Sequence, residues 1–400
     1  MAGDKGMNTG IALLAFAYVL SQFFRAFLAV LSPFLADDLG ASPEDLAFAS
    51  GLWFITFAAM QPPIGWALDT IGPRRTASVL LLLGGAGGAA LFALATTPAH
   101  VVVAMALIGI GCAPVLMASY YIFALDHPPA RFAFLAAVMV GVGTLGNIVA
   151  SYPTTLAAET MGWRAALWGL SALSALTAAG IWIAVRDPEK EPAALKGSFA
   201  EVLRIRALWL IFPLMLVSYA ELGALRGLWI GPYLTEVFNA EPRLIGQATL
   251  AMGIAMVIGP MAYSPLDRVF GSRKWVIFGG SCGMLLATVG MILLADTSVL
   301  WVIALMCAIG FFGSTYPSIM AHGRSLLPRH LVGRGVTMLN LCSIGGVGIA
   351  QFVTGRIYTA STPAAWSAQP FVTILTFFAA ALAAGLIIYV FAKDTKPDSA

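Results

Sequence analysis

Charged residues are scarce in this chain of 400 residues. They make up 10% of the sequence, hydrophobic residues make up 60%, and the mean hydropathy is +0.88. A soluble domain carries about 25% charged residues, and a soluble globule could not cover so much apolar surface. The composition therefore excludes a soluble protein and indicates an integral membrane protein, with the lipid bilayer as its surroundings.

Cysteine is also rare, and common enzyme motifs are missing. The four cysteines stand singly in apolar runs without a CxxC pair, which predicts neither a disulfide framework nor a zinc site. The sequence contains no HExxH or P-loop motif. We expect neither an enzyme nor a protein with a cofactor, a bound metal or a nucleic-acid partner.

Long apolar runs fill most of the chain. They lack the alternation of outer-membrane strands, so we predict an all-α membrane protein with twelve helical spans of about 20–28 residues. The first run carries Arg25 and is longer than the apolar core of a secretory signal, so we expect it to remain as a span. The predicted spans lie near 9–35, 46–67, 74–95, 101–124, 131–155, 162–185, 207–235, 244–266, 273–295, 299–321, 333–357 and 369–392.

One polar stretch interrupts these spans at the middle of the chain. It runs from Arg186 to Arg206, is mixed in charge and contains two prolines, which is typical of a linker. We predict an N-terminal six-helix half at 1–186, a cytoplasmic linker at 187–206 and a C-terminal six-helix half at 207–400. Of the 22 Lys and Arg residues, 17 fall on the linker's side of the spans and three on the other. This bias places both termini in the cytoplasm.

The two predicted halves repeat each other. "PFLADDLGASPEDL" from Pro33 resembles "PYLTEVFNAEPRLI" from Pro232, and "PPIGWALDTIGPRR" from Pro62 resembles "PMAYSPLDRVFGSRK" from Pro260. The offsets are 232 − 33 = 199 and 260 − 62 = 198 residues. Internal repetition of this kind is typical of transporters, whose substrate site lies between the repeats near the midplane of the membrane.

The segment "GWALDTIGPRR" resembles the loop signature G-x-x-x-D-x-x-G-x-[RK]-[RK] of the major facilitator superfamily. A second copy keeps the aspartate, the second glycine and the basic pair, but has Tyr263 in place of the first glycine. The resemblance implies a twelve-helix fold in two pseudo-symmetric halves that works by alternating access. It also implies a charge lock that breaks when the cytoplasmic side opens. The expected gating residues are Gly65, Asp69, Arg74, Arg75, Asp267 and Arg273.

Two arginines lie inside predicted spans. Tyr18 precedes Arg25, and Tyr219 precedes Arg226, by seven residues, which puts each pair on one face of a helix. An arginine at mid-bilayer costs roughly 2.5–3.5 kcal/mol, so two at equivalent points are hard to explain by packing. Facing each other, two guanidinium groups would hold one anionic group. The alternative is an ion pair that only stabilises the helices.

The same segments are similar to those of organophosphate:phosphate antiporters and related organic-anion carriers of this superfamily. In these carriers, one arginine in span one and one in span seven hold the anionic group of the substrate. The resemblance implies an anionic small-molecule substrate. Gln22, three residues before Arg25, could reach the same cavity. The candidate binding residues are Arg25, Arg226, Tyr18, Tyr219 and Gln22.

Glu221 is a further charge within the seventh span. It precedes Arg226 by five residues, which is about 140° around a helix, so we expect no salt bridge within the helix. A buried, unpaired carboxylate takes up a proton readily. Glu221 therefore either carries the proton that couples transport or pairs with another span.

Two other transport functions compete with anion transport. Proton-driven drug exporters carry an arginine in span four and a Gly-Pro pair in span five. Here "VVVAMALIGIGCAPVLM" has no arginine, and Gly146 is followed by Asn147. A copper or other soft-metal importer would use thioethers. Four methionines cluster in spans seven and eight, without a histidine: Met215, Met252, Met256 and Met261.

Our leading hypothesis is a monomeric secondary transporter of the bacterial inner membrane. It would move a small organic anion, a carboxylate or a phosphate ester, by proton symport or anion exchange. We also expect kinks at the prolines within spans, because proline removes a backbone hydrogen bond. These are Pro114, Pro213, Pro260 and Pro317.

Overall fold

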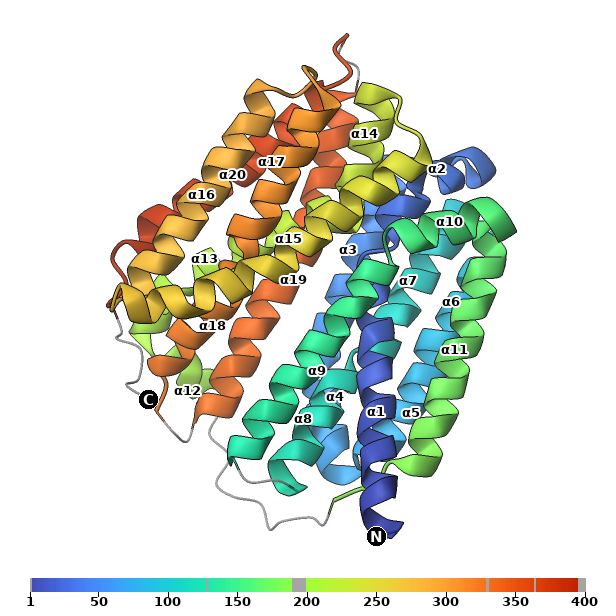
Figure 1. The fold of residues 1–400 in the computed structure, drawn as a ribbon, viewed down its shortest axis with the longest axis vertical. Coiled ribbons are helices and arrows are strands. Elements are labelled where there is room, and N and C mark those ends of the chain that lie inside the picture. Colours follow the sequence, from blue (N-terminus) through green and yellow to red (C-terminus); the bar gives the residue numbers. More distant parts are fainter. Residues whose placement is uncertain (1, 127–128, 189–198, 329–330, 363–364, 395–400) are drawn as a thin grey trace. The chain divides into compact units, whose positions relative to one another are not determined.

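The computed structural model describes residues 2–126, 129–188, 199–328, 331–362 and 365–394. Within these ranges every regular element is a helix, and no strand occurs (Figure 1). The chain separates into two compact units. One contains Met1–Pro192 and Pro242–Gly246, and the other contains Ala193–Glu241 and Gln247–Ala400.

The first unit consists of helices from the blue to green part of the chain in Figure 1. They are α1 (Ala2–Phe23), α2 (Leu28–Leu39), α3 (Pro43–Ala59), α4 (Gln61–Thr70), α5 (Pro73–Leu80), the π-helix η1 (Leu81–Ala86), α6 (Gly87–Ala93), α7 (Pro98–Cys112), α8 (Pro114–Asp126), α9 (Pro129–Val149), α10 (Tyr152–Met161) and α11 (Trp163–Ala184).

The second unit consists of the later helices, apart from the first five residues of α15, which belong to the first unit. They are α12 (Phe199–Leu203), the 3₁₀-helix η2 (Arg206–Leu210), α13 (Phe212–Ala224), the π-helix η3 (Leu225–Trp229), α14 (Ile230–Phe238), α15 (Pro242–Val269), α16 (Arg273–Leu293), α17 (Val299–Phe312), the 3₁₀-helix η4 (Gly313–Thr315), α18 (Tyr316–Ser325), α19 (Val332–Ser361) and α20 (Gln369–Tyr389).

Among the described residues, nine helical segments are long and apolar enough to cross a membrane, and a pair bent by 53°, Thr9–Phe23 with Leu28–Leu39, makes ten. Two predicted spans are instead divided. The span near 46–67 consists of α3 and α4, and the span near 131–155 consists of α9 and α10. In both spans, proline is the second residue of the later helix, α4 or α10. Proline fits the first turn of a helix but not its interior.

Other predicted kinks follow the same rule, with one exception. Helix α8 begins at Pro114 directly after α7, and η4 interrupts the tenth span just before Pro317. Pro213 lies in the first turn of α13. The exception is Pro260, which lies inside α15, a single helix from Pro242 to Val269.

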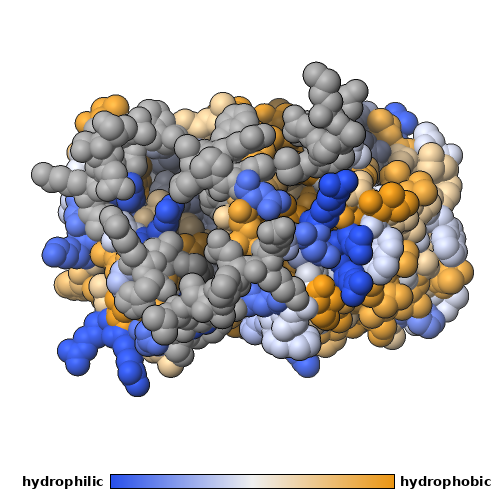
Figure 2. All heavy atoms as spheres, turned by 90° about the horizontal axis from the view of Figure 1, so that it is seen from below, coloured by the Kyte–Doolittle hydropathy of each residue, from blue (hydrophilic) through white to orange (hydrophobic). Residues whose placement is uncertain are grey.

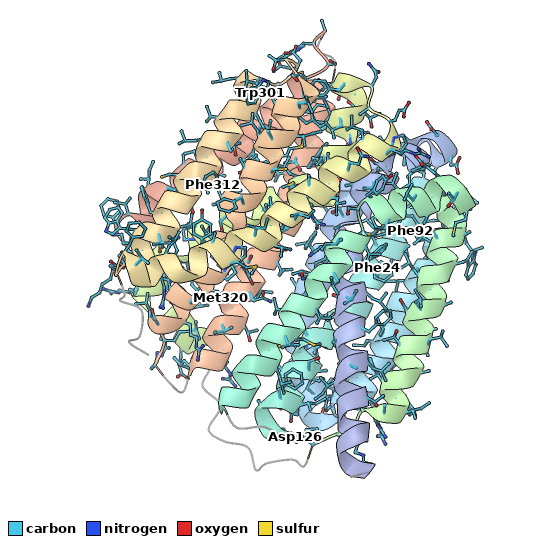
Figure 3. The ribbon with its side chains drawn as sticks, viewed as in Figure 1. Phe24, Phe92, Asp126, Trp301, Phe312 and Met320 are labelled. Atoms are coloured by element: carbon cyan, nitrogen blue, oxygen red, sulfur yellow. The ribbon has the colours of Figure 1, made fainter. Side chains whose placement is uncertain are left out.

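Small residues allow close packing inside the first unit. A Cβ added at Gly84 would lie 2.5 Å from Leu107 O, and one added at Gly111 would lie 2.1 Å from Gly85 N. The π-helix η1 and helix α7 therefore meet backbone to backbone, as small residues allow between membrane helices. Nearby, Phe24 and Phe92 are both fully buried in this unit (Figure 3).

Large apolar side chains cover much of the outside of both units. Ile183 is 81% exposed and Leu293 is 74% exposed. Figure 2 shows hydrophobic residues in orange beside hydrophilic residues in blue on one end of the molecule. A water-soluble protein would bury such residues, whereas lipid tails solvate them, so these surfaces are suited to contact with the bilayer.

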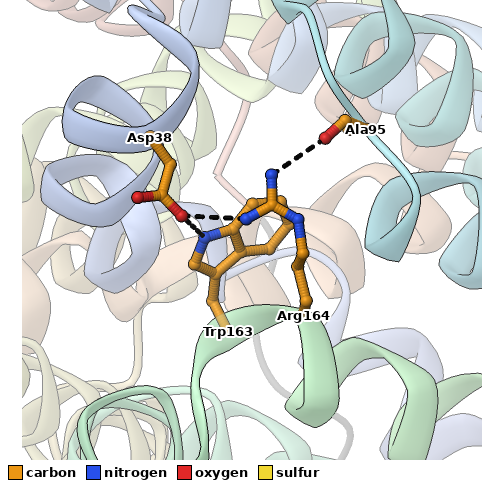
Figure 4. A network of polar contacts seen from close by, with 4 residues as sticks. All are labelled: Asp38, Ala95, Trp163 and Arg164. Atoms are coloured by element: carbon orange, nitrogen blue, oxygen red, sulfur yellow. Dashed lines mark hydrogen bonds and ion pairs between the residues drawn. The ribbon is translucent and has the colours of Figure 1, made fainter.

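A polar network joins three helix ends of the first unit (Figure 4). Asp38 Oδ2 accepts hydrogen bonds from Trp163 Nε1 at 2.7 Å and from Arg164 Nη1 at 2.9 Å. Arg164 Nη2 also donates to Ala95 O at 3.1 Å. The first span, the loop before α7 and the start of α11 are thereby fixed to one another.

We expect Asp38→Ala to lower stability by about 1–3 kcal/mol, because the buried indole N–H of Trp163 loses its acceptor. Most of this effect should come from the indole, since both ion-pair partners are well exposed and such pairs contribute little. Asp38→Asn keeps an acceptor and should cost less. The measurement is unfolding of purified protein in detergent. Asp37→Ala, which removes the neighbouring exposed carboxylate, is the control, and equal stability of the two alanine variants would contradict the prediction.

Candidate transport site

Arg25 lies at a break in the first span. Helix α1 ends at Phe23 and α2 begins at Leu28, so Arg25 belongs to the four-residue turn between them. The Phe23 and Phe27 rings flank the turn and stack at 5.6 Å. Two helix axes bent by 53° therefore meet at the charged residue.

Arg226 also lies where regular α-helix gives way. It is the second residue of η3, a π-helix inserted between α13 and α14. A π-bulge adds one residue to a helix, leaves the backbone locally irregular and often marks functional sites. The arginines at positions 25 and 226 thus occupy irregular backbone in the first long span of each unit.

The two breaks differ, and this explains an asymmetry between the repeats. Proline follows Arg25 after eight residues but follows Arg226 after six. The first span turns sharply through four non-helical residues, whereas the seventh continues from Arg206 to Phe238 through a π-bulge. The extra two residues in the first repeat therefore fall where its helix is interrupted.

The Arg25 guanidinium packs on aromatic rings of α3. Its Cζ lies 5.3 Å from the Trp53 ring centroid and 4.8 Å from that of Phe57. Cation–π contacts of this kind stabilise a partly desolvated cation without a carboxylate. No carboxylate of the described residues lies within ion-pair distance of Arg25, and its buried Nε has no hydrogen-bond acceptor there. Among the described residues of the first unit, Arg25 therefore forms no stabilising ion pair.

The Arg226 guanidinium lies against a glycine of α15. A Cβ added at Gly253 would meet Arg226 Nη2 at 3.2 Å and Nε at 3.4 Å. Arg226 is only 4% exposed, and Tyr219, two turns earlier, is close enough to interact with it electrostatically. The glycine was not identified from the sequence. With the repeat offset of 199 residues, Gly253 corresponds to Phe54. Phe54 directly follows Trp53, one of the two aromatic residues that contact Arg25.

The remaining predicted binding residues are divided between the units. Tyr18 packs on span five, where a Cβ at Gly143 would lie 2.3 Å from its ring. Gln22 is buried, and its Oε1 has no hydrogen-bond partner among the described residues. Tyr18, Gln22 and Arg25 belong to the first unit, and Tyr219 and Arg226 belong to the second.

Tyr219 belongs to a small polar and aromatic cluster. Its ring lies 5.1 Å from the ring of Tyr316, whose hydroxyl donates to Asn340 Oδ1 at 2.8 Å. From the sequence, Tyr316 and Asn340 are possible lining residues of the same cavity as Tyr219, but their mutual contacts follow only from the fold, because they lie on α18 and α19.

Glu221 is buried inside the second unit with a side chain of α16. It is 1% exposed, and its Oε1 accepts a 2.5 Å hydrogen bond from Thr288 Oγ1. Its Oε2 is buried without a partner among the described residues. Among the described residues, no ion pair joins Glu221 to Arg226. A carboxylate in these surroundings is stable when it binds a proton or another cation.

The first loop signature is anchored to the end of span six. Arg74 N donates to Asp187 Oδ1 at 2.8 Å, and Arg74 Nε lies 3.8 Å from Asp187 Oδ2. Gly72, with φ of +105°, permits this approach, because an added Cβ would lie 2.7 Å from Asp187 Oδ1. Asp187 was missed from the sequence, although it directly follows a span. Asp69 and Arg75 are exposed.

The second loop copy has the same kind of anchor. Asp394, just after the last span, accepts from Ser272 Oγ at 2.6 Å and from Lys274 N at 3.1 Å. Arg273, one of the expected gating residues, begins α16. The side chain of Asp267 lies outside the described residues. Gly65, in the first copy, has no described heavy atom within 4 Å of an added Cβ.

The methionines singled out for copper binding are used in packing. Met252 is fully buried, and the side chains of Met252 and Met256 approach Gly310 of α17 at 3.2 and 3.4 Å from an added Cβ. Met261 is 72% exposed. The described residues also contain no group of three His, Cys, Asp or Glu side chains that could hold a metal ion.

The family of the chain follows from its sequence. The profile of the Major Facilitator Superfamily matches residues 14–230, and the chain belongs to this family of membrane transporters. It is therefore a multi-pass membrane transporter of small molecules rather than an enzyme. The probable sulfoacetate transporter SauU of Cupriavidus necator is 24% identical over 164 residues. That match spans 41% of this chain and 38% of the relative's own length.

Solved structures of transporters share the fold over nearly the whole chain. A bacterial homolog of the human lysosomal transporter Spinster, inward-facing and occupied, gives a TM-score of 0.72 at 16% identity and covers 96% of this chain and 94% of that one. A variant of the nucleoside transporter NupG gives 0.73 at 15%, with 96% and 99% covered. The D-xylose–proton symporter gives 0.76 at 14%, with 96% and 98% covered. The predicted all-α, twelve-helix fold class of this family is confirmed.

Proposed function

We propose that this protein moves a small organic anion across the bacterial inner membrane by alternating access. Arg25 and Arg226 would hold the anionic group, and Tyr18, Tyr219 and Gln22 would line the same site. The observation that supports the proposal most directly is the position of both arginines at helix breaks, at equivalent points of the two repeats. We further propose a monomer with an N-terminal half at 1–186, a linker at 187–206, a C-terminal half at 207–400 and both termini in the cytoplasm.

The chemistry of the site suits an oxyanion. A guanidinium group presents paired N–H donors that match two oxygens of a carboxylate, sulfonate or phosphate. The Arg25 side chain has aromatic neighbours but no acidic one among the described residues, so its charge is available to a ligand. The relative in Cupriavidus necator has sulfoacetate in its name. We therefore choose sulfoacetate, which carries a carboxylate and a sulfonate, as the first substrate to test.

Removal of either arginine should weaken binding of sulfoacetate. A buried hydrogen bond to a charged group contributes about 1.5–3 kcal/mol, which is roughly ten- to over a hundredfold in affinity. We expect losses of this size for Arg25→Ala and Arg226→Ala in calorimetry on monodisperse protein. Arg25→Lys should also bind more weakly, because lysine keeps the charge but lacks the planar guanidinium group with its paired N–H donors. The double variant should lose less binding free energy than the two single variants added together, since both arginines bind one ligand.

Arg356→Ala is a matched control, because Arg356 is an exposed arginine of α19. It should retain wild-type affinity. Gly253→Ala offers a second test that leaves both arginines in place. Its added Cβ would lie 3.2 Å from Arg226 Nη2, so the guanidinium must shift slightly, and we expect weaker binding. Well-folded arginine variants with unchanged affinity would overturn the proposed anion site.

We propose that Glu221 carries the proton that couples transport. Glu221→Gln keeps the size of the side chain and an oxygen for the Thr288 hydroxyl, but it cannot exchange a proton. The variant should lose accumulation of sulfoacetate driven by a pH gradient and retain exchange of labelled for unlabelled sulfoacetate. Both can be measured in proteoliposomes. Glu236→Gln, which changes another carboxylate of the same span, is the control. Normal pH-driven accumulation by Glu221→Gln would reassign Glu221 to packing.

We propose that the loop residues Gly65, Asp69, Arg74, Arg75, Asp267 and Arg273 form the cytoplasmic gate. Asp69 is exposed at the end of α4, so its replacement should not unfold the protein. Asp69→Ala should strongly reduce uptake while the protein still inserts and purifies normally. Asp126→Ala, which removes another exposed carboxylate at a helix end, should transport normally. Wild-type uptake by Asp69→Ala would remove this residue from the gate.

A further inference from the structure

Three buried hydroxyl groups of the second unit lack partners near Glu221. Ser218, Ser281 and Thr315 are each fully buried, and their hydroxyl oxygens have no hydrogen-bond partner among the described residues. Glu221 Oε2 shares this property. Buried polar groups without partners are rare in native proteins and usually indicate internal water or an ion.

These groups come from neighbouring elements of the unit. Ser218 lies one helical turn before Glu221 on α13 and so faces the same side. Ser281 lies two turns before Thr288 on α16, the residue that donates to Glu221. Thr315 belongs to η4, the break in the tenth span. Its methyl group would lie 2.5 Å from a Cβ added at Gly280, next to Ser281.

The row of hydroxyls leads towards the beginning of α16. Thr288 lies 15 residues after Arg273, or about 22 Å along the helix. Gly280 lies about 10 Å from Arg273 along the same helix. The hydroxyl of Tyr263 also reaches Gly280, at 2.7 Å from an added Cβ. Gly280 therefore leaves the space in which Thr315 and Tyr263 meet α16. Polar side chains thus recur from Glu221 towards the end of the unit that our proposed topology places in the cytoplasm, with about 10 Å of α16 between Thr288 and Ser281.

Among the described residues, no charged group forms an ion pair with the Glu221 carboxylate. The one hydrogen bond that the described residues give it comes from the Thr288 hydroxyl. The titratable groups on the elements packed against α13 are Arg206 on η2, Arg226 on η3, Arg273, Lys274 and Cys282 on α16, Tyr316, His322 and Arg324 on α18, Arg334, Cys342, Arg356 and Tyr358 on α19, and Tyr389 on α20, besides Tyr219 on α13 itself. A buried carboxylate with no cation beside it needs a proton or a bound metal cation.

We propose that Ser218, Thr315, Ser281 and Tyr263, with water between them, form the path by which protons reach Glu221 from the beginning of α16. The inference rests on the proposed role of Glu221 as the proton carrier. Hydroxyl groups and water both donate and accept hydrogen bonds, so a chain of them passes a proton in either direction. The proton ends on the carboxylate as a neutral carboxylic acid, and no other bond changes.

The test follows Glu221 directly and needs no substrate. Its protonated carboxyl group gives an infrared carbonyl band, assigned as the band lost in Glu221→Gln. On transfer of reconstituted protein to D₂O the band shifts as the proton exchanges. In the double variant Ser281→Ala with Thr315→Val, exchange should be roughly tenfold slower or more, equivalent to about 1.4 kcal/mol added to the barrier. Both changes remove hydroxyls that have no partner, so the fold should tolerate them.

Ser174→Ala is the matched control, because Ser174 is an equally buried hydroxyl without a partner, in the other unit. Its exchange rate should equal that of the wild type. Wild-type exchange in the double variant would overturn the path and leave the role of Glu221 intact. Absence of a protonated band, or its loss when NaCl replaces choline chloride at fixed pH, would overturn both in favour of an ionised carboxylate or a sodium site. Neither result depends on which anion is transported.

Discussion

A cation placed inside an apolar helix constrains everything around it. The Arg25 guanidinium rests on two aromatic rings of α3, and the Arg226 guanidinium occupies the space left by Gly253 of α15. In each unit, the arginine of the first long span contacts the next span of the same unit, which is α3 for Arg25 and α15 for Arg226. The helix is irregular at the same point in both, so the residue that carries the charge also lies where the span can bend. A ligand bound as we propose would therefore neutralise a charge that lies where the helix is irregular.

Irregular backbone is concentrated in a subset of the spans. The helices are interrupted or distorted at Arg25, at Met60, at η1, near Pro114, near Ser151, at η3 and at η4. By contrast, α11, α16 and α20 run for 21 or 22 residues without interruption. Proline explains several of these breaks, because it cannot donate the hydrogen bond of a helix interior.

The sequence predicted the fold well, because composition and apolar runs determine the choice of helices in a membrane. It also located Arg25, Arg226 and Glu221, since a charge in an apolar run is conspicuous. It could not show that Trp53 and Phe57 receive one arginine and Gly253 the other, because these contacts join separate helices. Nothing in the sequence distinguishes Thr288 from other threonines. Only the structure shows that its hydroxyl donates a 2.5 Å hydrogen bond to Glu221.

Breaks that depend on proline were easier to predict than breaks that do not. Pro114 and Pro317 mark interruptions, but the turn at Arg25 and the π-bulge at Arg226 contain no proline. A single sequence therefore gives no proline signal for either break. Pro260 shows the reverse case, since its helix continues through it. Asp187 and Asp394 were overlooked because each lies just outside a span, where a charged residue is usual.

The anchors formed by Asp187 and Asp394 have a consequence for the construction of the chain. Each joins the residue that follows the last span of a six-helix set to the beginning of the third span of the same set. Each anchor therefore joins residues on one side of the segment between 188 and 199. Two separately translated polypeptides, divided within that segment, would each contain both partners of their own anchor.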